Sequence, residues 1–268
     1  MRNKGKKEKI ALVPKKEKRA STIAFLIIAV LFLIATIQTQ FQPFEFLVNM
    51  ENFWMFIFED LFPPQISDVE TIAQGVLQTI CMAIAASLLS AIISLVLAFL
   101  GSNTTAPWKG LKKIIRFFAS IQRNIPSMIW TFILIMAFGI GTVVGALALL
   151  ITTCGFLIRS FIETIDEIGG ESLEALQSVG AGRLSIITQV IIPASLPGFI
   201  SWLLYSLEVN IRSSTLVGAV GGGGIGLIMM GYIKQFRYHS AMGVILLIAA
   251  VVILVDLLTN YLRKKVLT

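Results

Sequence analysis

The stretch ESLEALQSVGAGRLSIITQVIIPASLP, residues 171–197, is the longest polar interruption between two strongly apolar blocks of the sequence. It holds the triplet Glu174-Ala175-Leu176, then Gly180 and, after a further apolar run, Pro193. A segment this polar is not expected to stay in lipid, where its polar groups would lack hydrogen-bond partners. The interruption therefore separates two apolar parts of the chain.

Within this stretch the pattern predicts two short helices. The apolar stripe of the first, at about 171–179, consists of Leu173, Leu176 and Val179. Gly180 is a natural helix stop, because glycine readily adopts the left-handed conformation of a C-terminal cap. The second helix is expected to run towards Ile192 and to end at Pro193. Gly169-Gly170 is expected to separate the first helix from the acidic residues before it.

The whole sequence has the composition of a membrane protein. Its 268 residues are 56% hydrophobic and 14% charged, with a mean hydropathy of +0.85, whereas a soluble domain carries roughly 25% charged residues. Several apolar runs approach the about 20 residues that a transmembrane helix needs. Because these runs are continuous rather than alternating, they indicate an all-α integral membrane protein and not a barrel.

About six transmembrane helices are expected. They lie at about 20–37, 71–100, 121–138, 142–158, 195–216 and 240–262. In the second of them, small residues recur every four positions, which allows a neighbouring helix to approach closely. These small residues are Ala83, Ser87, Ser90, Ala91, Ser94 and Ala98.

The basic residues predict the orientation of these helices. The net charge of +7 comes from clusters beside the apolar runs, as the preference of Lys and Arg for the cytoplasmic side predicts, and nucleic-acid binding is not indicated. The clusters are 1–19, 101–120, Arg159 and Arg263-Lys264-Lys265. Six spans in the cell membrane with both termini in the cytoplasm satisfy every cluster at once.

The chain is expected to have three regions. Residues 1–19 form a basic cytoplasmic arm that can touch membrane lipid, and residues 20–70 hold the first span and an extracytoplasmic interfacial segment rich in aromatic residues. Residues 71–268 hold the other spans, with the polar loop at about 163–194. A cleaved signal peptide is the competing interpretation of the first span, but Thr36-Ile37-Gln38 is a poor match to a cleavage site.

Polar side chains mark one face of the fifth span. They are Ser201, Tyr205, Glu208, Arg212 and Thr215. Their spacing of four, three, four and three residues puts them on one helix face, and it lets Glu208 and Arg212 pair one turn apart. Ionisable residues at membrane depth usually face a bundle interior or a water-filled path. An internal ion pair at a helix contact and the lining of a translocation path both stay open.

The segment Gly218–Gly226, GAVGGGGIG, follows the fifth span and contains a GxGxxG string. A nucleotide site is not indicated, because no strand–helix unit surrounds the string. Glycines permit bends and close packing, so they are candidates for a gate. The candidate gate glycines are Gly221, Gly223, Gly224 and Gly226. Residues 217–233 form either a re-entrant or broken membrane segment or a plain flexible loop.

No catalytic constellation is present in the sequence. It has no HExxH motif and no serine elbow, and nothing brings a nucleophile together with a base and an orienting partner. His239 is the only histidine, so a histidine-based metal site is not expected. The sequence therefore predicts neither an enzyme nor a resident cofactor.

The polar stretch resembles the EAA loop of bacterial ABC importer permeases, whose pattern is Glu-Ala-Ala-x3-Gly-x9-Ile-x-Leu-Pro. Leu176, Val190 and Ile192 depart from that pattern conservatively. The resemblance implies a type I ABC importer (MetI-like) permease, in which this loop is a coupling helix that inserts into a cytoplasmic ATPase. The residues that it marks for coupling are Glu174, Ala175, Leu176, Gly180 and Pro193.

A closer resemblance, to the phosphonate ABC transporter permease, covers most of the chain after about residue 60. It rests on Arg123-Asn124-Ile125-Pro126, on 204–212 and on 217–226. It implies transport of phosphonates or a related phosphorus oxyanion, with a cytoplasmic ATPase dimer and an extracytoplasmic binding protein. It also implies a second permease copy, in a homodimer or in a pair with a similar permease. The candidates for the translocation path are then Ser201, Tyr205, Glu208, Asn210, Arg212 and Thr215.

Two other functions stay open. A secondary transporter or channel would use Glu208 and Arg212 as its ion or proton element, but it would not need the polar loop. An ABC permease for another small solute would keep the same fold, because the family's binding protein chooses most of the substrate.

Overall fold

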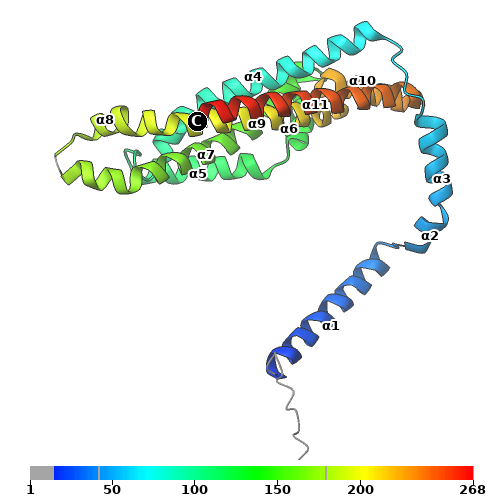
Figure 1. Cartoon of the computed structure of the whole chain (residues 1–268), viewed down its shortest axis with the longest axis horizontal. Helices are drawn as coiled ribbons and strands as arrows, with labels where there is room; N and C mark the ends of the chain where they lie inside the picture. Colours follow the sequence, from blue (N-terminus) through cyan, green and yellow to red (C-terminus); the bar gives the residue numbers. More distant parts are fainter. Residues whose placement is uncertain (1–14, 42, 179, 268) are drawn as a thin grey trace, which may run out of the picture. The chain divides into compact units, whose positions relative to one another are not determined.

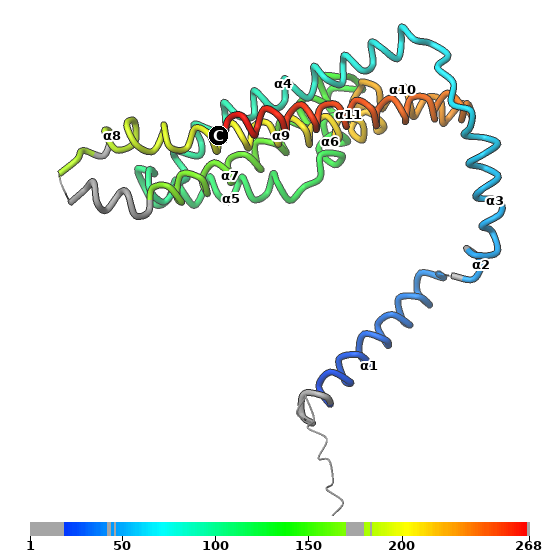
Figure 2. The backbone as a smooth tube through the Cα atoms, viewed as in Figure 1, coloured from blue at the N-terminus to red at the C-terminus, as the bar shows by residue number. Residues whose placement is uncertain are grey.

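The computed structural model describes the backbone of residues 15–41, 43–178 and 180–267, and this part of the chain is helical without strands. The side chains of 15–18, 43, 46, 170–178, 183 and 267 lie outside the described part. In chain order the elements are α1 (Lys15–Gln38), α2 (Pro43–Val48), α3 (Met50–Met55), η1 (Phe56–Leu61), α4 (Val69–Gly101), α5 (Lys109–Asn124), α6 (Ser127–Phe138), α7 (Thr142–Ser178), α8 (Arg183–Ile186), η2 (Ile187–Ile191), α9 (Ile192–Val217), η3 (Gly218–Gly222), α10 (Gly224–Lys234) and α11 (Tyr238–Leu267), the η segments being wide π-helical turns (Figures 1 and 2). They form two compact units, Met1–Phe58 and Glu59–Thr268.

The first unit contains one long apolar helix. Within α1, the segment Arg19–Gln38 is long and apolar enough to cross a membrane, which confirms the first predicted span. Its apolar side chains are exposed, Phe25 by 70% and Phe32 by 65%, as suits a helix surrounded by lipid. Residues 1–14 of the predicted arm lie outside the described residues, and 15–19 already belong to α1.

Among the described residues, five helices are long and apolar enough to cross a membrane, and the bent pair α5–α6 makes six if it is one span. The predicted all-α membrane fold with about six spans is confirmed. The second, fourth, fifth and sixth predicted spans lie within α4, α7, α9 and α11. Asp68 caps the start of α4, and hydrogen bonds from the hydroxyl and amide of Thr71 lower the pKa of its carboxyl.

The third predicted span, 121–138, is divided between two helices. α5 and α6 meet at 91° across Ile125-Pro126, because a proline disfavours the helical conformation of the residue before it. Residues 109–120, expected to form part of a loop, make up most of α5 instead. Ile115 and Ala119 are buried on its inner side. The segment is therefore an amphipathic helix, although its many basic residues suggested a loop.

α7 runs without a break from Thr142 to Ser178, so the prediction that Gly169-Gly170 separates two helices is wrong. Gly169 lies against the loop after α4, where an added Cβ would come within 2.4 Å of Cγ2 of Thr104. This glycine therefore allows close packing rather than a helix stop. The segment Thr142–Gly169 is apolar enough to be a span, so the polar loop begins later than the sequence suggests.

The second short helix of the polar stretch does not end at Pro193. α8, η2 and α9 follow one another directly, and Pro193 is the second residue of α9. Proline is tolerated in the first turn of a helix because the missing amide is least needed there. The wide turn of η2 comes immediately before it. The stretch therefore leads without interruption into the fifth span.

The second unit is built around α7, which packs against α4, α5 and α9. Leu157, Phe161 and Ile165 of α7 are at most 2% exposed. Small residues of α4 bring the two long helices together. The Ser90 hydroxyl donates to the carbonyl of Leu150 at 3.0 Å, and the Ser94 hydroxyl donates to the carbonyl of Cys154 at 3.3 Å. The packing role predicted for these small residues of α4 is thereby confirmed.

Candidate functional site

The turn between α7 and α8 carries the predicted helix stop. Gly180 has a φ of +81°, is exposed, and has no atom within 4 Å of an added Cβ. The left-handed cap expected at this glycine is confirmed. Glu174, Ala175 and Leu176 fall in the last turns of α7, and their side chains lie outside the described residues. α8 and α10 lie at opposite ends of the second unit (Figure 1).

A cavity of about 220 Å³, lined by polar and apolar side chains, lies between α5, α6, α7 and α9. Its lining residues are Arg123, Ser127, Leu149, Thr152, Thr153, Phe156, Tyr205, Ser206, Val209, Asn210 and Ser213. Six of them carry a hydroxyl, which can donate or accept a hydrogen bond. The space is several times the roughly 30 Å³ that one water occupies in the liquid. The cavity can therefore hold a small polar solute together with water.

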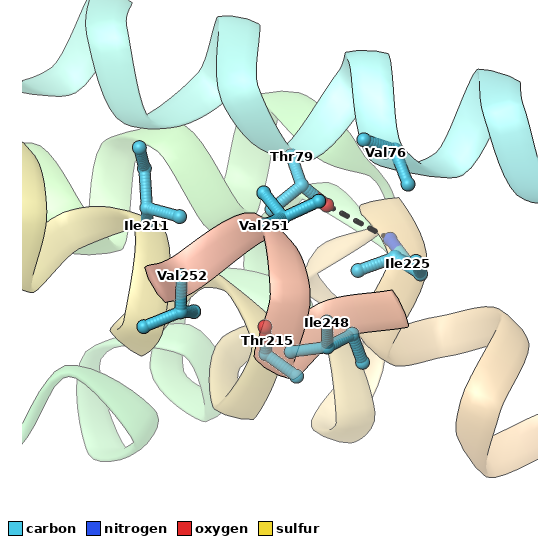
Figure 3. Close-up of a pocket in the computed structure, with 8 residues that line it drawn as sticks. All are labelled: Val76, Thr79, Ile211, Thr215, Ile225, Ile248, Val251 and Val252. Carbon is cyan, nitrogen blue, oxygen red and sulfur yellow. Dashed lines mark hydrogen bonds between the residues drawn. The ribbon is translucent and has the colours of Figure 1, made fainter. Parts of the chain in front are cut away.

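The six residues predicted for the translocation path on the fifth span lie in different surroundings. Tyr205 and Asn210 line the cavity, and Ser201 does not. Thr215 instead lines an apolar space of about 10 Å³ between α4, α9, α10 and α11 (Figure 3), which is too small for a solute. Glu208 pairs with a residue of α11. The sequence correctly put these residues on one helix, but the fold brings only two of them to the cavity.

The ion pair expected between Glu208 and Arg212 is confirmed. Nη2 of Arg212 lies 2.9 Å from Oε1 of Glu208, and Nη2 of Arg263 lies 3.9 Å from the other carboxylate oxygen. The Glu208 side chain is 12% exposed and that of Arg212 is 59% exposed. Two arginines therefore neutralise this carboxylate, and the longer contact with Arg263 connects α9 to α11. The participation of Arg263 was not predicted.

Asn210 connects three helices at the cavity wall. Its Oδ1 accepts a hydrogen bond from the Thr153 hydroxyl at 2.9 Å, and its Nδ2 donates to the Ser87 hydroxyl at 2.8 Å. The residue is 3% exposed, so both ends of its amide are satisfied within the protein. Asn210 thus positions α4, α7 and α9 around the cavity.

The glycine segment is packed inside the second unit, and the alternative of a plain flexible loop is wrong. All four candidate gate glycines are buried. A Cβ added at Gly226 would lie 2.0 Å from the carbonyl oxygen of Thr215, and Gly221 has a φ of +113° at a kink inside η3. The Ile225 amide donates to the Thr79 hydroxyl at 2.9 Å, which fastens α10 to α4 (Figure 3). The segment is a broken helix covered by protein.

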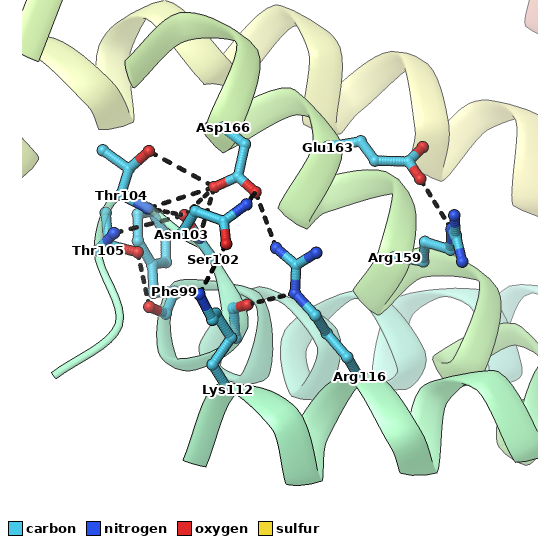
Figure 4. Close-up of polar contacts among 11 residues, drawn as sticks. Phe99, Ser102, Asn103, Thr104, Thr105, Lys112, Arg116, Arg159, Glu163 and Asp166 are labelled. Carbon is cyan, nitrogen blue, oxygen red and sulfur yellow. Dashed lines mark hydrogen bonds and ion pairs between the residues drawn. The ribbon is translucent and has the colours of Figure 1, made fainter. Parts of the chain in front are cut away.

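A second polar site lies where α7 meets the loop after α4 (Figure 4). Oδ1 of Asp166 accepts hydrogen bonds from the Ser102 hydroxyl at 2.5 Å and the Asn103 amide at 2.7 Å. Oδ2 accepts from Nδ2 of Asn103 at 2.6 Å and pairs with Nη2 of Arg116 at 2.8 Å. Nε of Arg116 also donates to the carbonyl of Gly101 at 2.9 Å. One carboxylate therefore holds α4, α5 and α7 together.

Sequence reasoning missed the functional placement of Arg123, Ser127 and Asp166. Arg123 entered only as part of a resemblance, and its position at the cavity depends on the bend between α5 and α6. The one sequence signal for that bend is Pro126. Asp166 lies among the acidic residues before Gly169, and no local pattern marks it because its partners are distant in the sequence.

Long apolar helices, a broken glycine segment and a cavity between the helices are typical of a multi-pass membrane transport protein. The description "Binding-protein-dependent transport system inner membrane component" matches residues 99–268, and the chain belongs to this family. The recognition of a binding-protein-dependent ABC importer permease is thereby confirmed.

Individual relatives agree with this assignment. The chain is similar to the phosphite transport system permease protein PtxC of Stutzerimonas stutzeri, at 32% identity over 75% of this chain and 74% of that protein. It is similar to the phosphate-import permease protein PhnE of Mycolicibacterium smegmatis, at 28% identity over 79% of this chain and 40% of that protein. Its fold is similar to a solved chain of the inward-facing MetNI methionine ABC transporter, with a TM-score of 0.65 and 23% identity over 74% of this chain and 97% of that one. The predicted type I importer permease fold is confirmed.

Proposed function

We propose that this chain is the membrane-spanning permease subunit of an ATP-driven importer for phosphonates or a related phosphorus oxyanion. The observation that carries the proposal is the similarity, over 75% of the chain, to a phosphite transport permease. The cavity, with an arginine and six hydroxyl-bearing side chains in its lining, supports an anionic cargo. The chain itself provides the conduit, and separate partners supply energy and substrate.

The proposed orientation places both termini and the turn at Gly180 in the cytoplasm of a cell whose membrane the protein spans. Lys109, Lys113 and Arg116 lie on α5. The ion pair between Arg116 and Asp166 joins α5 to the part of α7 that leads to the turn at Gly180. The basic cluster and this turn therefore share one end of the unit. Lys and Arg concentrate on the cytoplasmic side of membrane proteins.

Energy enters this proposed importer at the turn between α7 and α8. The coupling surface consists of Glu174, Ala175, Leu176 and Gly180, with Pro193 at the start of the fifth span. A cytoplasmic ATPase dimer binds there and hydrolyses ATP. α7 continues from this surface to the cavity residue Thr152, and α9 continues to Tyr205. A displacement of the coupling surface therefore reaches both cavity walls through helices rather than loops.

The remaining partners complete the transport cycle. An extracytoplasmic binding protein delivers the anion at the α10 end, and a second permease copy, most simply this same chain, closes the conduit. Exposed apolar side chains of α4 and α6, such as Leu89 and Phe132, are 51% exposed in a single chain and are available to that copy or to lipid. The four buried glycines form the outer gate, where their small size permits helix movement.

Of the six residues predicted for the path, Tyr205 and Asn210 are the two that line the cavity. Asn210 shapes the wall because its amide is already satisfied. Ser201, Glu208, Arg212 and Thr215 lie outside the cavity lining and act on the path only through helix packing. Since Arg212 and Arg263 neutralise Glu208, this carboxylate gives little support to an ion-coupled transporter.

Reconstitution into liposomes tests the proposal. We expect uptake of phosphite only when the permease, the ATPase, ATP and the binding protein are all present, and no effect of a protonophore. The matched control is the permease alone under an imposed proton gradient. Uptake in that control, abolished by the protonophore, would refute the importer and establish a secondary transporter.

A further inference from the structure

We infer that the cavity between α5, α6, α7 and α9 is a binding site for one tetrahedral phosphorus oxyanion, with Arg123 as its counter-charge. The inference rests on the proposed function for the identity of the anion. It goes beyond that function by assigning substrate recognition to this chain as well as to a binding protein. Four properties of the cavity support it: an arginine without an ion pair, unused donors, a helix N-terminus and an apolar wall.

Arg123 is an exposed residue, and its guanidinium has no counter-charge among the described side chains. The other arginines of 59–268 with described side chains all have a partner: Arg116 pairs with Asp166, Arg159 with Glu163, Arg212 and Arg263 with Glu208, and Arg237 lies over the ring of Tyr232. Among the side chains that the structure describes, none forms an ion pair with Arg123. A guanidinium without a counter-charge beside a confined space attracts an anion, and its planar fork matches two oxygens of a phosphorus oxyanion.

Unused hydrogen-bond donors surround the same space. The hydroxyls of Thr153 and Ser206 are engaged with Asn210 and with the carbonyl of Leu203. In the described part of the chain, those of Ser127, Tyr205 and Ser213 have no such partner. These three hydroxyls line the cavity from α6 and α9 and can donate to anionic oxygens.

The start of α6 adds a further favourable charge. Ser127 is the first residue of this 12-residue helix, and the first α6 amides that donate to a carbonyl are those of Ile129 and Trp130. The free amides at a helix N-terminus carry partial positive charge and favour an anion. Arg123 and the α6 terminus therefore act on the cavity together.

The rest of the lining is apolar. Leu149, Phe156 and Val209 come from α7 and α9. A phosphonate or phosphite has three oxygens and one vertex that accepts no hydrogen bond, so its oxygens fit the donors while that vertex fits this wall. The cavity volume of about 220 Å³ also leaves room for a small organic substituent. We therefore expect the site to accept methylphosphonate at least as well as inorganic phosphate.

Arg123 also occupies the last turn of α5, where any cation stabilises the negative end of the helix dipole. Substitution with lysine separates these two roles. Arg123→Lys keeps the charge at the helix end, but it lacks the bidentate fork. A purely structural arginine would tolerate this change in every assay.

The test is a calorimetric titration of the purified full-length permease–ATPase complex without ATP, using sodium phosphite, methylphosphonate and phosphate as probes. We expect one saturable site per permease chain. Loss of charge-assisted hydrogen bonds should weaken phosphite binding about 10- to 100-fold in Arg123→Ala and several-fold in Arg123→Lys. Lys113→Ala, which removes an exposed charge from the same helix, should bind as the wild type does. Thermal unfolding checks that all variants are folded.

Each remaining outcome has a defined meaning. Absence of a saturable site in the wild type, equal affinity in Arg123→Ala, or tenfold weaker binding of methylphosphonate than of phosphate would overturn the inference.

Repeating the titration in nanodiscs rich in phosphatidylglycerol identifies the source of the anion. Unchanged affinity there supports a soluble substrate, whereas lost phosphite binding assigns Arg123 to a lipid phosphate and overturns the substrate site. ATP-driven phosphite uptake by the wild type is measured separately, so the proposed function can stand even if this site fails.

Discussion

Asp166 of α7 and Arg116 of α5 form an ion pair in which Oδ2 and Nη2 lie 2.8 Å apart. The same carboxylate accepts hydrogen bonds from the amide and side chain of Asn103, so it fixes the loop after α4 as well. Asp166 lies on the helix that leads to the proposed coupling surface. In the proposed importer we therefore expect a movement of α7 to be transmitted through Asp166 to α5 and to the loop after α4.

Asp166→Ala is expected to loosen this junction. The substitution removes the carboxylate that accepts hydrogen bonds from Ser102, Asn103 and Arg116. We expect a loss of about 1–3 kcal/mol in unfolding free energy, together with reduced transport. Thermal unfolding of the purified protein measures the first effect, and phosphite-stimulated ATPase activity of the reconstituted complex measures the second.

Glu163→Ala is the matched control for Asp166→Ala. Glu163 lies on the same helix and pairs with Arg159 at the same 2.8 Å, but these side chains are 61% and 52% exposed. An exposed pair contributes less than about 1 kcal/mol. Equal effects of the two substitutions would contradict the role given to Asp166.

The sequence predicted those features that depend on local pattern. Long apolar runs predicted α4, α9 and α11, and Gly180 predicted the end of α7. Local sequence pattern gave the wrong prediction where one type of residue occurs in two different structures. Glycine commonly ends a helix, but Gly169 lies inside α7, where its lack of a side chain allows contact with Thr104. In α5 the many basic residues suggested a loop, although Ile115 and Ala119 form a buried apolar side. The cavity could not be predicted, because Arg123 meets Tyr205 across it only after α5 and α6 bend.

Gly226→Ala is expected to disrupt the packing of the broken segment. The new Cβ would lie 2.0 Å from the Thr215 carbonyl oxygen, and overpacking of this kind costs about 1–3 kcal/mol or more. Thermal unfolding and uptake should both fall. Gly231→Ala in the same helix meets nothing within 4 Å and should behave as the wild type does. Wild-type stability of Gly226→Ala would show that this contact is not present in the folded protein.

Glu208→Gln tests whether the fifth-span carboxylate carries ions or holds helices. The change removes the charge between Arg212 and Arg263, and we expect a stability loss of about 1–3 kcal/mol. Arg212→Ala should cost less, because that side chain is 59% exposed. Uptake by the folded Glu208→Gln protein should remain dependent on ATP and within about threefold of the wild type. Complete loss of uptake at unchanged stability would instead indicate a direct transport role for Glu208.

Substitutions of Gly180 separate the backbone requirement of the coupling surface from its contacts. Since no atom lies within 4 Å of an added Cβ, a side chain here acts chiefly through the φ of +81°. Asparagine tolerates this conformation, alanine does so less well, and a β-branched residue is strained by about 1–3 kcal/mol. Uptake should therefore fall in the order Gly180→Asn, Gly180→Ala, Gly180→Val, with loss in the last, while membrane insertion stays normal. Gly182→Ala, whose Cβ would meet only the Ser185 hydroxyl at 3.9 Å, is the control. Normal uptake by Gly180→Val would show that the conformation of this turn is not needed for coupling to the ATPase.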